Sequence, residues 1–235
     1  MSFGSVPFGA NHSGVSSPQL SPITALLATM TSKSGVVCAG LAAGRSDPKH
    51  RYKALQEEIE KEIGHAVFVQ NDITAAAAGE SMFGSAKPHA DYLYFYLGHE
   101  LHSRLVLNHQ IYNSNSPLSF DIGIGALDRL ARGKGLATEP LWDRSLSWPD
   151  YGALLIAWEN DLIASMRNSN AALAQFVEVK TVILSSYVPE DVCQALCAKL
   201  GTALPGVAAL AGKLSPSPKA VGAASLPFSS RFMVE

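Results

Sequence analysis

Short apolar runs alternate with longer amphipathic segments along most of this chain of 235 residues, and this alternation limits the possible folds. The runs GVVCAGLAA at 35–43 and AVFVQ at 66–70 are typical of buried strands, which contact other protein on both faces. Other segments repeat apolar residues every three or four positions, as one face of a helix does; they include 48–64, 148–168 and 189–200. This alternation predicts an α/β fold with a largely parallel sheet, in which ligands bind beyond the carboxyl ends of strands.

The first part of the chain has weaker signals. Residues 1–17 are rich in glycine and serine and lack a period, which favours a loop, a disordered start or the edge of a truncated chain. Ser21 and Pro22 form a helix-start pattern, so we expect a helix that ends near Met30.

Composition excludes several classes of protein. Apolar residues make up 47% of the chain and charged residues 16%, with a net charge of -2, which is typical of a globular protein. The sequence contains no cluster of lysine and arginine residues of the kind that forms a DNA-binding face. It also contains no run of eighteen apolar residues that could span a membrane, and its N-terminus lacks the pattern of a signal peptide. The three cysteines, Cys38, Cys193 and Cys197, lack the spacing of a disulfide framework and favour a reducing, cytoplasmic compartment. We interpret Cys193 and Cys197, four residues apart, as core residues of one helix face.

One strand end carries a candidate for chemistry. The run ending at Gln70 is followed by Asn71 and Asp72, and an alanine-rich helix pattern begins there. A carboxylate at a strand end can accept a proton from a ligand hydroxyl. The alternative is that Asp72 only caps the helix that follows.

The segment VFVQNDITAAAAGESMFG at 67–84 resembles the ROK family of bacterial repressors, open reading frames and sugar kinases. The order of elements from about residue 20 to 230 resembles this family as well. The resemblance implies an actin-like (ribonuclease H-like or hexokinase-type) two-lobed α/β fold with mixed, largely parallel sheets. It implies that Asn71 and Asp72 bind a sugar, with Asp72 as the general base if the protein is a kinase.

Two motifs that would hold a nucleotide in a ROK kinase are altered. The glycine-rich phosphate loop is reduced to Gly98, followed by His99 and Glu100, which places a negative charge where phosphates would lie. The glycine pair near the adenosine is replaced by Ser185 and Ser186. The Asp-x-Gly-x-Thr phosphate motif is absent from residues 1–45, so we expect no ATP or magnesium cofactor.

The family's Gly-Glu-Ile-Gly-His stretch aligns with residues 120–124. Asp121 then replaces the sugar-binding glutamate, and Ile124 replaces the zinc-binding histidine. No cysteine lies between Cys38 and Cys193, so we expect no structural zinc. The loop that zinc would brace is predicted to pack on apolar side chains instead; these are Leu118, Phe120 and Ile124.

The expected lobes are residues 1–72, with 218–235 as a possible addition, and residues 73–217. The leading hypothesis is a ligand-sensing domain of a ROK transcriptional regulator, catalytically degenerate, that binds a sugar or sugar derivative. It would form a homodimer through the helix at 148–168 and act on DNA only through a domain outside this chain, without a membrane partner. The alternatives are a divergent ATP-dependent sugar kinase and a dimerisation or scaffold module without a ligand.

Overall fold

The computed structural model describes residues 2–7, 25–32, 35–43, 49–112, 119–214, 217–226 and 233–234, with backbone alone for those before residue 53 and for 119, 233 and 234. The chain divides into two compact units: residues 1–79 with 217–233, and residues 80–216 with 234–235. The predicted boundary after Asp72 lies at the start of a helix, whereas the division into units falls inside that helix, after Gly79.

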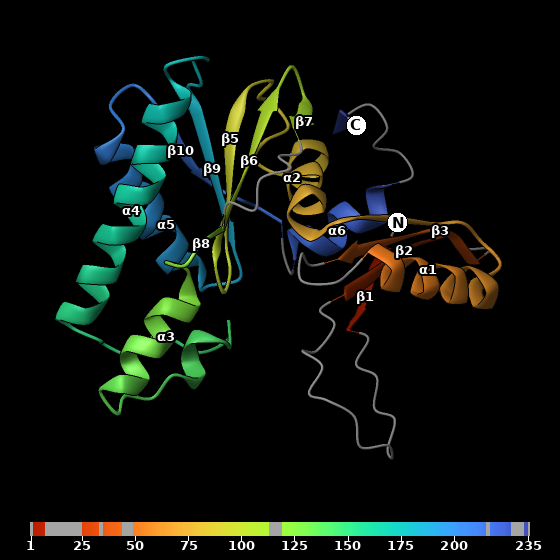
Figure 1. Ribbon diagram of the computed structural model, residues 1–235, viewed down its shortest axis with the longest axis horizontal. Helices are drawn as coiled ribbons and strands as arrows, with labels where there is room; N and C mark the ends of the chain where they lie inside the picture. Colours follow the sequence, from red (N-terminus) through yellow and green to blue (C-terminus); the bar gives the residue numbers. More distant parts are fainter. Residues whose placement is uncertain are drawn as a thin grey trace. The chain divides into compact units, whose positions relative to one another are not determined.

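The first unit has one four-stranded sheet, in the order β1-β2-β3-β4 (Figure 1). The strands are β1 (Ser2–Pro7), β2 (Ala25–Ser32), β3 (Gly35–Ala43) and β4 (Val67–Asn71). The first three are antiparallel neighbours, and β4 runs parallel to β3. Three helices accompany the sheet: α1 (Lys49–Ile63), the start of α2 (Asp72–Phe83), and α6 (Pro218–Ser225).

Two expectations for the first forty residues are wrong. The helix predicted from Pro22 to Met30 is replaced by strand β2, and part of the glycine-rich start forms β1. Short apolar runs do not distinguish a strand from a helix by period alone. Here β2 takes its hydrogen-bond partners from β1 and β3 on either side, so neighbouring strands decide the structure.

The second unit is built on a larger sheet in the order β10-β9-β5-β6-β7-β11, with β8 paired to β6. Strand β5 is antiparallel to β6 and parallel to β9, so the sheet is mixed as expected. Its strands are β5 (Tyr92–Leu97), β6 (Leu101–Leu107), β7 (Gln110–Tyr112), β8 (Ser119–Phe120), β9 (Thr181–Ser186), β10 (Ala208–Ala211) and β11 (Met233–Val234).

Helices α4 (Ala153–Leu173) and α5 (Glu190–Ala203) lie along one face of this sheet (Figure 1). The alternate residues Leu93, Phe95 and Leu97 of β5 join the core formed with these helices. The tyrosines between them are buried as well, so β5 is covered on both faces. Helix α3 (Ile124–Gly133) and a short 3-10 turn (Glu139–Leu141) follow β8.

Candidate functional site

The junction of β4 and α2 holds the first two predicted site residues. Asn71 is the last residue of β4, and its side-chain oxygen accepts hydrogen bonds from the backbone N–H groups of Ile73 and Thr74, at 3.1 and 3.3 Å. These are the donors that the first turn of a helix leaves without a partner. The cap of α2 is therefore supplied by Asn71, whereas the sequence alternative assigned that part to Asp72.

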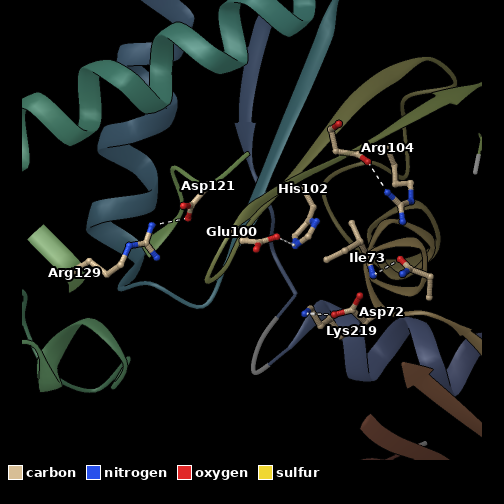
Figure 2. Close-up of polar contacts among 10 residues, drawn as sticks. Asp72, Ile73, Glu100, His102, Arg104, Asp121, Arg129 and Lys219 are labelled. Atoms are coloured by element: carbon tan, nitrogen blue, oxygen red, sulfur yellow. Dashed lines mark hydrogen bonds and ion pairs between the residues drawn. The ribbon is translucent and has the colours of Figure 1, made fainter. Parts of the chain in front are cut away.

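Asp72 makes a different contact. Its Oδ2 atom accepts a hydrogen bond from the ammonium of Lys219 on α6, at 2.5 Å, and the two side chains keep 17% and 23% of their surface exposed (Figure 2). Lys219 was not among the predicted site residues. It lies three residues before Gly222, outside the motifs that the sequence analysis singled out.

Gly222 explains how Lys219 comes to Asp72. A Cβ atom at Gly222 would lie 1.6 Å from the carbonyl oxygen of Ala75, so only glycine lets α6 approach α2 so closely. Asp72 lies three residues before Ala75, and Lys219 lies three residues before Gly222. Asp72 and Lys219 thus each lie about one helical turn before the residue at which their helices touch. The contact between Ala75 and Gly222 therefore brings the two charged residues together.

The turn predicted to replace the phosphate loop, at 98–100, joins β5 to β6. Its carbonyl groups accept hydrogen bonds from the N-terminus of α3: Ile124 donates to Gly98, at 2.8 Å, and Gly125 donates to His99, at 3.0 Å. Backbone N–H groups at a helix start are the donors that could bind a phosphate. At the start of α3 these two donors are already bonded to the carbonyl groups of the turn.

An aromatic row covers the same turn. The ring of Trp142 stacks with the imidazole of His99 and with the ring of Tyr187, at centroid distances of 5.8 and 6.2 Å. Its indole N–H donates to Asp128, at 2.9 Å, and Arg132 holds the other carboxylate oxygen, at 2.8 Å. Burial opposes ionisation of Asp128, but these hydrogen bonds outweigh it and lower the pKa of its carboxyl.

The serine pair at the end of β9 faces inward. Ser185 donates to the buried carboxylate of Glu80, at 3.1 Å, and Ser186 donates to the carbonyl of Leu97, at 2.7 Å. Glu80 also accepts from the backbone N–H groups of Ser85 and Leu214, at 2.8 and 3.2 Å, so both of its carboxylate oxygens are hydrogen-bonded. Both serine side chains thus bond within the second unit.

The remaining predicted residues lie in the same unit. Glu100 is 3.9 Å from the imidazole of His102, and Asp121 pairs with Arg129 of α3, at 2.6 Å, with 69% of the Asp121 side chain exposed (Figure 2). A hollow of about 340 Å³ borders Asp121; it is lined by Ile122, Ala126, Arg129, Leu130, Trp158 and Asp161. Asn71 and Asp72 belong to the first unit and Asp121 to the second.

Apolar side chains do support the loop before α3. Ile124 is fully buried and Phe120 packs against the core, whereas Leu118 lies outside the described residues. Trp158 adds a polar anchor, because its indole N–H donates to the carbonyls of Ile122 and Gly123. Across the described ranges, no group of three or more histidine, cysteine, aspartate or glutamate side chains is placed to hold a metal.

Cys193 and Cys197 are both buried in the core beside α4, in agreement with their interpretation as core residues. No helix within the described parts of the chain is long and apolar enough to cross a membrane.

Comparison with known proteins shows a similarity to one family over part of the chain. The model of the ROK family matches residues 38–128, which include β4, α2, the altered turn and Asp121. These residues are therefore similar to the ROK family. Part of the chain is also 28% identical over 74 residues to the xylose repressor of Bacillus subtilis (strain 168); the match covers 32% of this chain and 19% of that protein.

Solved ROK structures have the same fold. A ROK hexokinase from Thermus thermophilus superposes with a TM-score of 0.58 at 13% identity, over 88% of this chain and 96% of that one. A ROK glucokinase from Streptomyces griseus, solved with glucose and AMPPNP, gives 0.59 at 14% identity, over 86% and 95%. A ROK transcriptional regulator, a homologue of the E. coli MLC protein, gives 0.54 at 13% identity, over 85% and 74%. At these identities the likeness establishes the actin-like α/β fold and leaves the activity open.

Proposed function

We propose that this chain is the ligand-sensing domain of a ROK transcriptional regulator, that it binds a sugar or sugar derivative, and that it lacks kinase activity. The observation that carries the proposal is the Asn71-Asp72 junction together with a turn at 98–100 whose carbonyl groups hold the start of α3. A carboxylate at this strand end can accept a hydrogen bond from a ligand hydroxyl, whereas the turn at 98–100 provides few favourable contacts for the phosphates of a nucleotide.

The sugar part rests on Asp72. Its Oδ2 atom is held by Lys219, and among the described residues no hydrogen bond is made by its Oδ1 atom. Hydroxyl groups donate readily to a carboxylate oxygen, and such charge-assisted hydrogen bonds are short and strong. The xylose repressor match and the regulator of the same fold support a sensing role over a purely structural one.

The argument against a kinase rests on the turn at 98–100. A phosphate bound there would lie near the Glu100 carboxylate, and the N–H groups of Ile124 and Gly125 at the start of α3 already donate to the carbonyls of Gly98 and His99. Trp142 and its partners already cover this turn through stacking and the contact with Asp128. The proposed function therefore does not include binding of ATP or magnesium.

A sensing domain needs a ligand that binds two states of the protein with different affinity. Helix α2 suits this purpose, because Asp72 at its start belongs to the first unit and its end belongs to the second. In the proposed regulator, DNA is bound by a domain outside this chain, and a homodimer forms through the face of α4.

Thermal unfolding tests the proposal. The chain is heated with D-xylose, hexoses, amino sugars and their phosphates, each with and without Mg-ATP. A ligand that binds only the folded protein raises the melting temperature, by several degrees when its concentration is far above Kd. We expect one sugar to raise it, no effect of Mg-ATP, and loss of the sugar effect in Asp72→Ala.

Asp191→Ala is the matched control, because Asp191 is an exposed aspartate in the first turn of α5 and should leave the Asp72 sugar response unchanged. A melting shift with Mg-ATP that needs Asp72 would instead establish a divergent kinase. If Asp72→Ala binds every sugar as well as the parent does, the proposed site is wrong. If no compound raises the melting temperature of the parent, the site is also wrong and the scaffold alternative is favoured.

A further inference from the structure

Lys219 lies in an unfavourable place for a cation. It is in the first turn of α6, directly after Pro218, where the helix carries a partial positive charge. A lysine there is disfavoured unless an anion lies close by. The Asp72 carboxylate supplies that anion, at 2.5 Å, and the first turn of α2 favours a negative charge.

The ion pair is held by rigid parts of the first unit. Ala75, Ala220, Ala223 and Ala224 form a small apolar cluster between α2 and α6, with each of these side chains almost entirely buried. Gly222 adds the close backbone approach described above. Neither helix can withdraw without opening this contact, so the carboxylate and the ammonium stay side by side.

The acceptor Asp72 and the donor Lys219 lie side by side, and both side chains remain partly exposed. A lysine ammonium carries three N–H donors and can hold a carboxylate and a ligand oxygen together. Two neighbouring hydroxyl groups of a sugar ring match this arrangement: one donates to Asp72 and the next accepts from Lys219.

Resting on the proposed function, we propose that Lys219 is a second ligand-binding residue, which with Asp72 selects a neutral sugar with two adjacent hydroxyl groups. The charges of the pair cancel, so the site favours an uncharged polyol over a sugar phosphate or an amino sugar. Loss of either hydroxyl leaves one charged group of the pair without its ligand partner.

The test combines protein variants with ligand variants. Titration calorimetry measures the affinity of the full chain for D-glucose, D-xylose and their monodeoxy analogues, in the parent, Lys219→Met and Lys219→Arg. In the parent we expect one analogue of the bound sugar to bind at least about tenfold more weakly, as for a lost hydrogen bond to a charged group. Lys219→Met should bind the sugar about tenfold more weakly and no longer distinguish that analogue.

Lys219→Arg should recover part of the affinity, because it restores a charged donor. Lys61→Met, which removes the exposed lysine from the last turn of α1, is the control and should bind as the parent does. A structural role alone would alter the melting temperature of Lys219→Met while leaving its discrimination between sugar and analogue intact.

The two proposals fail in different ways. If the parent binds a sugar through Asp72 but Lys219→Met keeps both affinity and discrimination, the role of Lys219 is wrong and the sensing proposal stands. If neither D-glucose, D-xylose nor any analogue binds the parent, both are overturned for this class of ligand.

Discussion

Neighbouring residues of similar chemistry take separate parts at the start of α2. Asn71 and Asp72 can each cap a helix, but the structure gives the cap to Asn71 and leaves the Asp72 carboxylate for Lys219. An amide serves as well as a carboxylate at a cap. Only the carboxylate adds a charge that can pair with an ammonium and bind a ligand hydroxyl strongly.

Asp128 gives a prediction for pH dependence. Its folded-state pKa is lowered from the ordinary value of 3.8, because hydrogen bonds from Trp142 and Arg132 outweigh the effect of burial. The stability from these contacts is present above the unfolded pKa and is lost as pH falls through the lowered folded pKa. We expect the melting temperature of Asp128→Asn to fall less than that of the parent between pH 5 and pH 3.

The measurement is a series of thermal melts over this pH range, in which the other carboxyl groups titrate alike in both proteins. At pH 7 Asp128→Asn should melt below the parent, since Arg132 loses its partner. Parallel acid profiles for the two proteins would contradict this account of Asp128.

Small residues decide how the elements of the first unit pack. The α2–α6 contact depends on Gly222, since any side chain there would meet the Ala75 carbonyl. In the second unit Gly123 has a similar part, because a Cβ atom there would lie 2.3 Å from the carbonyl oxygen of His99. These glycines allow two helices to approach the segments that carry the site.

We therefore predict that Gly222→Ala is destabilising. The added methyl must push α6 away from α2, at a cost of about 1–3 kcal/mol in the free energy of unfolding. Denaturant melts measure this change, and sugar binding at Asp72 should weaken in parallel. Gly201→Ala in α5 is the control, because the added Cβ atom would lie 3.8 Å from the Cβ atom of Ala209, which is an ordinary contact. Alanine is also more favourable than glycine in a helix, by about 1 kcal/mol, so this variant should not be destabilised. Equal stability of the two variants would show that the α2–α6 contact can relax.

At the scale of the whole molecule, each compact unit has its own sheet and its own core. The large apolar cluster of α3, α4, α5 and the second sheet lies entirely in the second unit. The small alanine cluster and the cluster formed by α1 and β4 belong to the first. Each unit can therefore lose stability locally before the whole chain unfolds.

Leu162 tests this division. It is fully buried in the α4 core, so Leu162→Ala should lower stability by about 2–5 kcal/mol through lost contacts and a cavity. In hydrogen exchange followed by mass spectrometry, protection should fall mostly in β5, β9 and α4, and much less in β4 and α1. An equal loss of protection in both units would mean that they unfold as one cooperative body.

The sequence by itself determined the α/β class, the order of most elements after residue 35, and the strand–Asn–Asp–helix junction at 67–84. These signals are local: apolar period, cap residues and the sequence of a single motif. Local patterns predict the wrong structure for 22–30, because this run is compatible with either a helix or a strand. Hydrogen bonds with β1 and β3 determine that it forms a strand. Local patterns carry information only about contacts between residues close in the chain.

Tertiary structure alone decided the partners of the candidate site. Asp72 and Lys219 are 147 residues apart, and Glu80 and Ser185 are 105 apart, so no spacing pattern could predict either contact. The same holds for Trp142, which meets His99 and Tyr187 only after the sheet has formed. The sequence showed which groups could do chemistry, and packing through Gly222 and Ala75 decided which of them meet, because the closest approach of two helices depends on the smallest side chains between them.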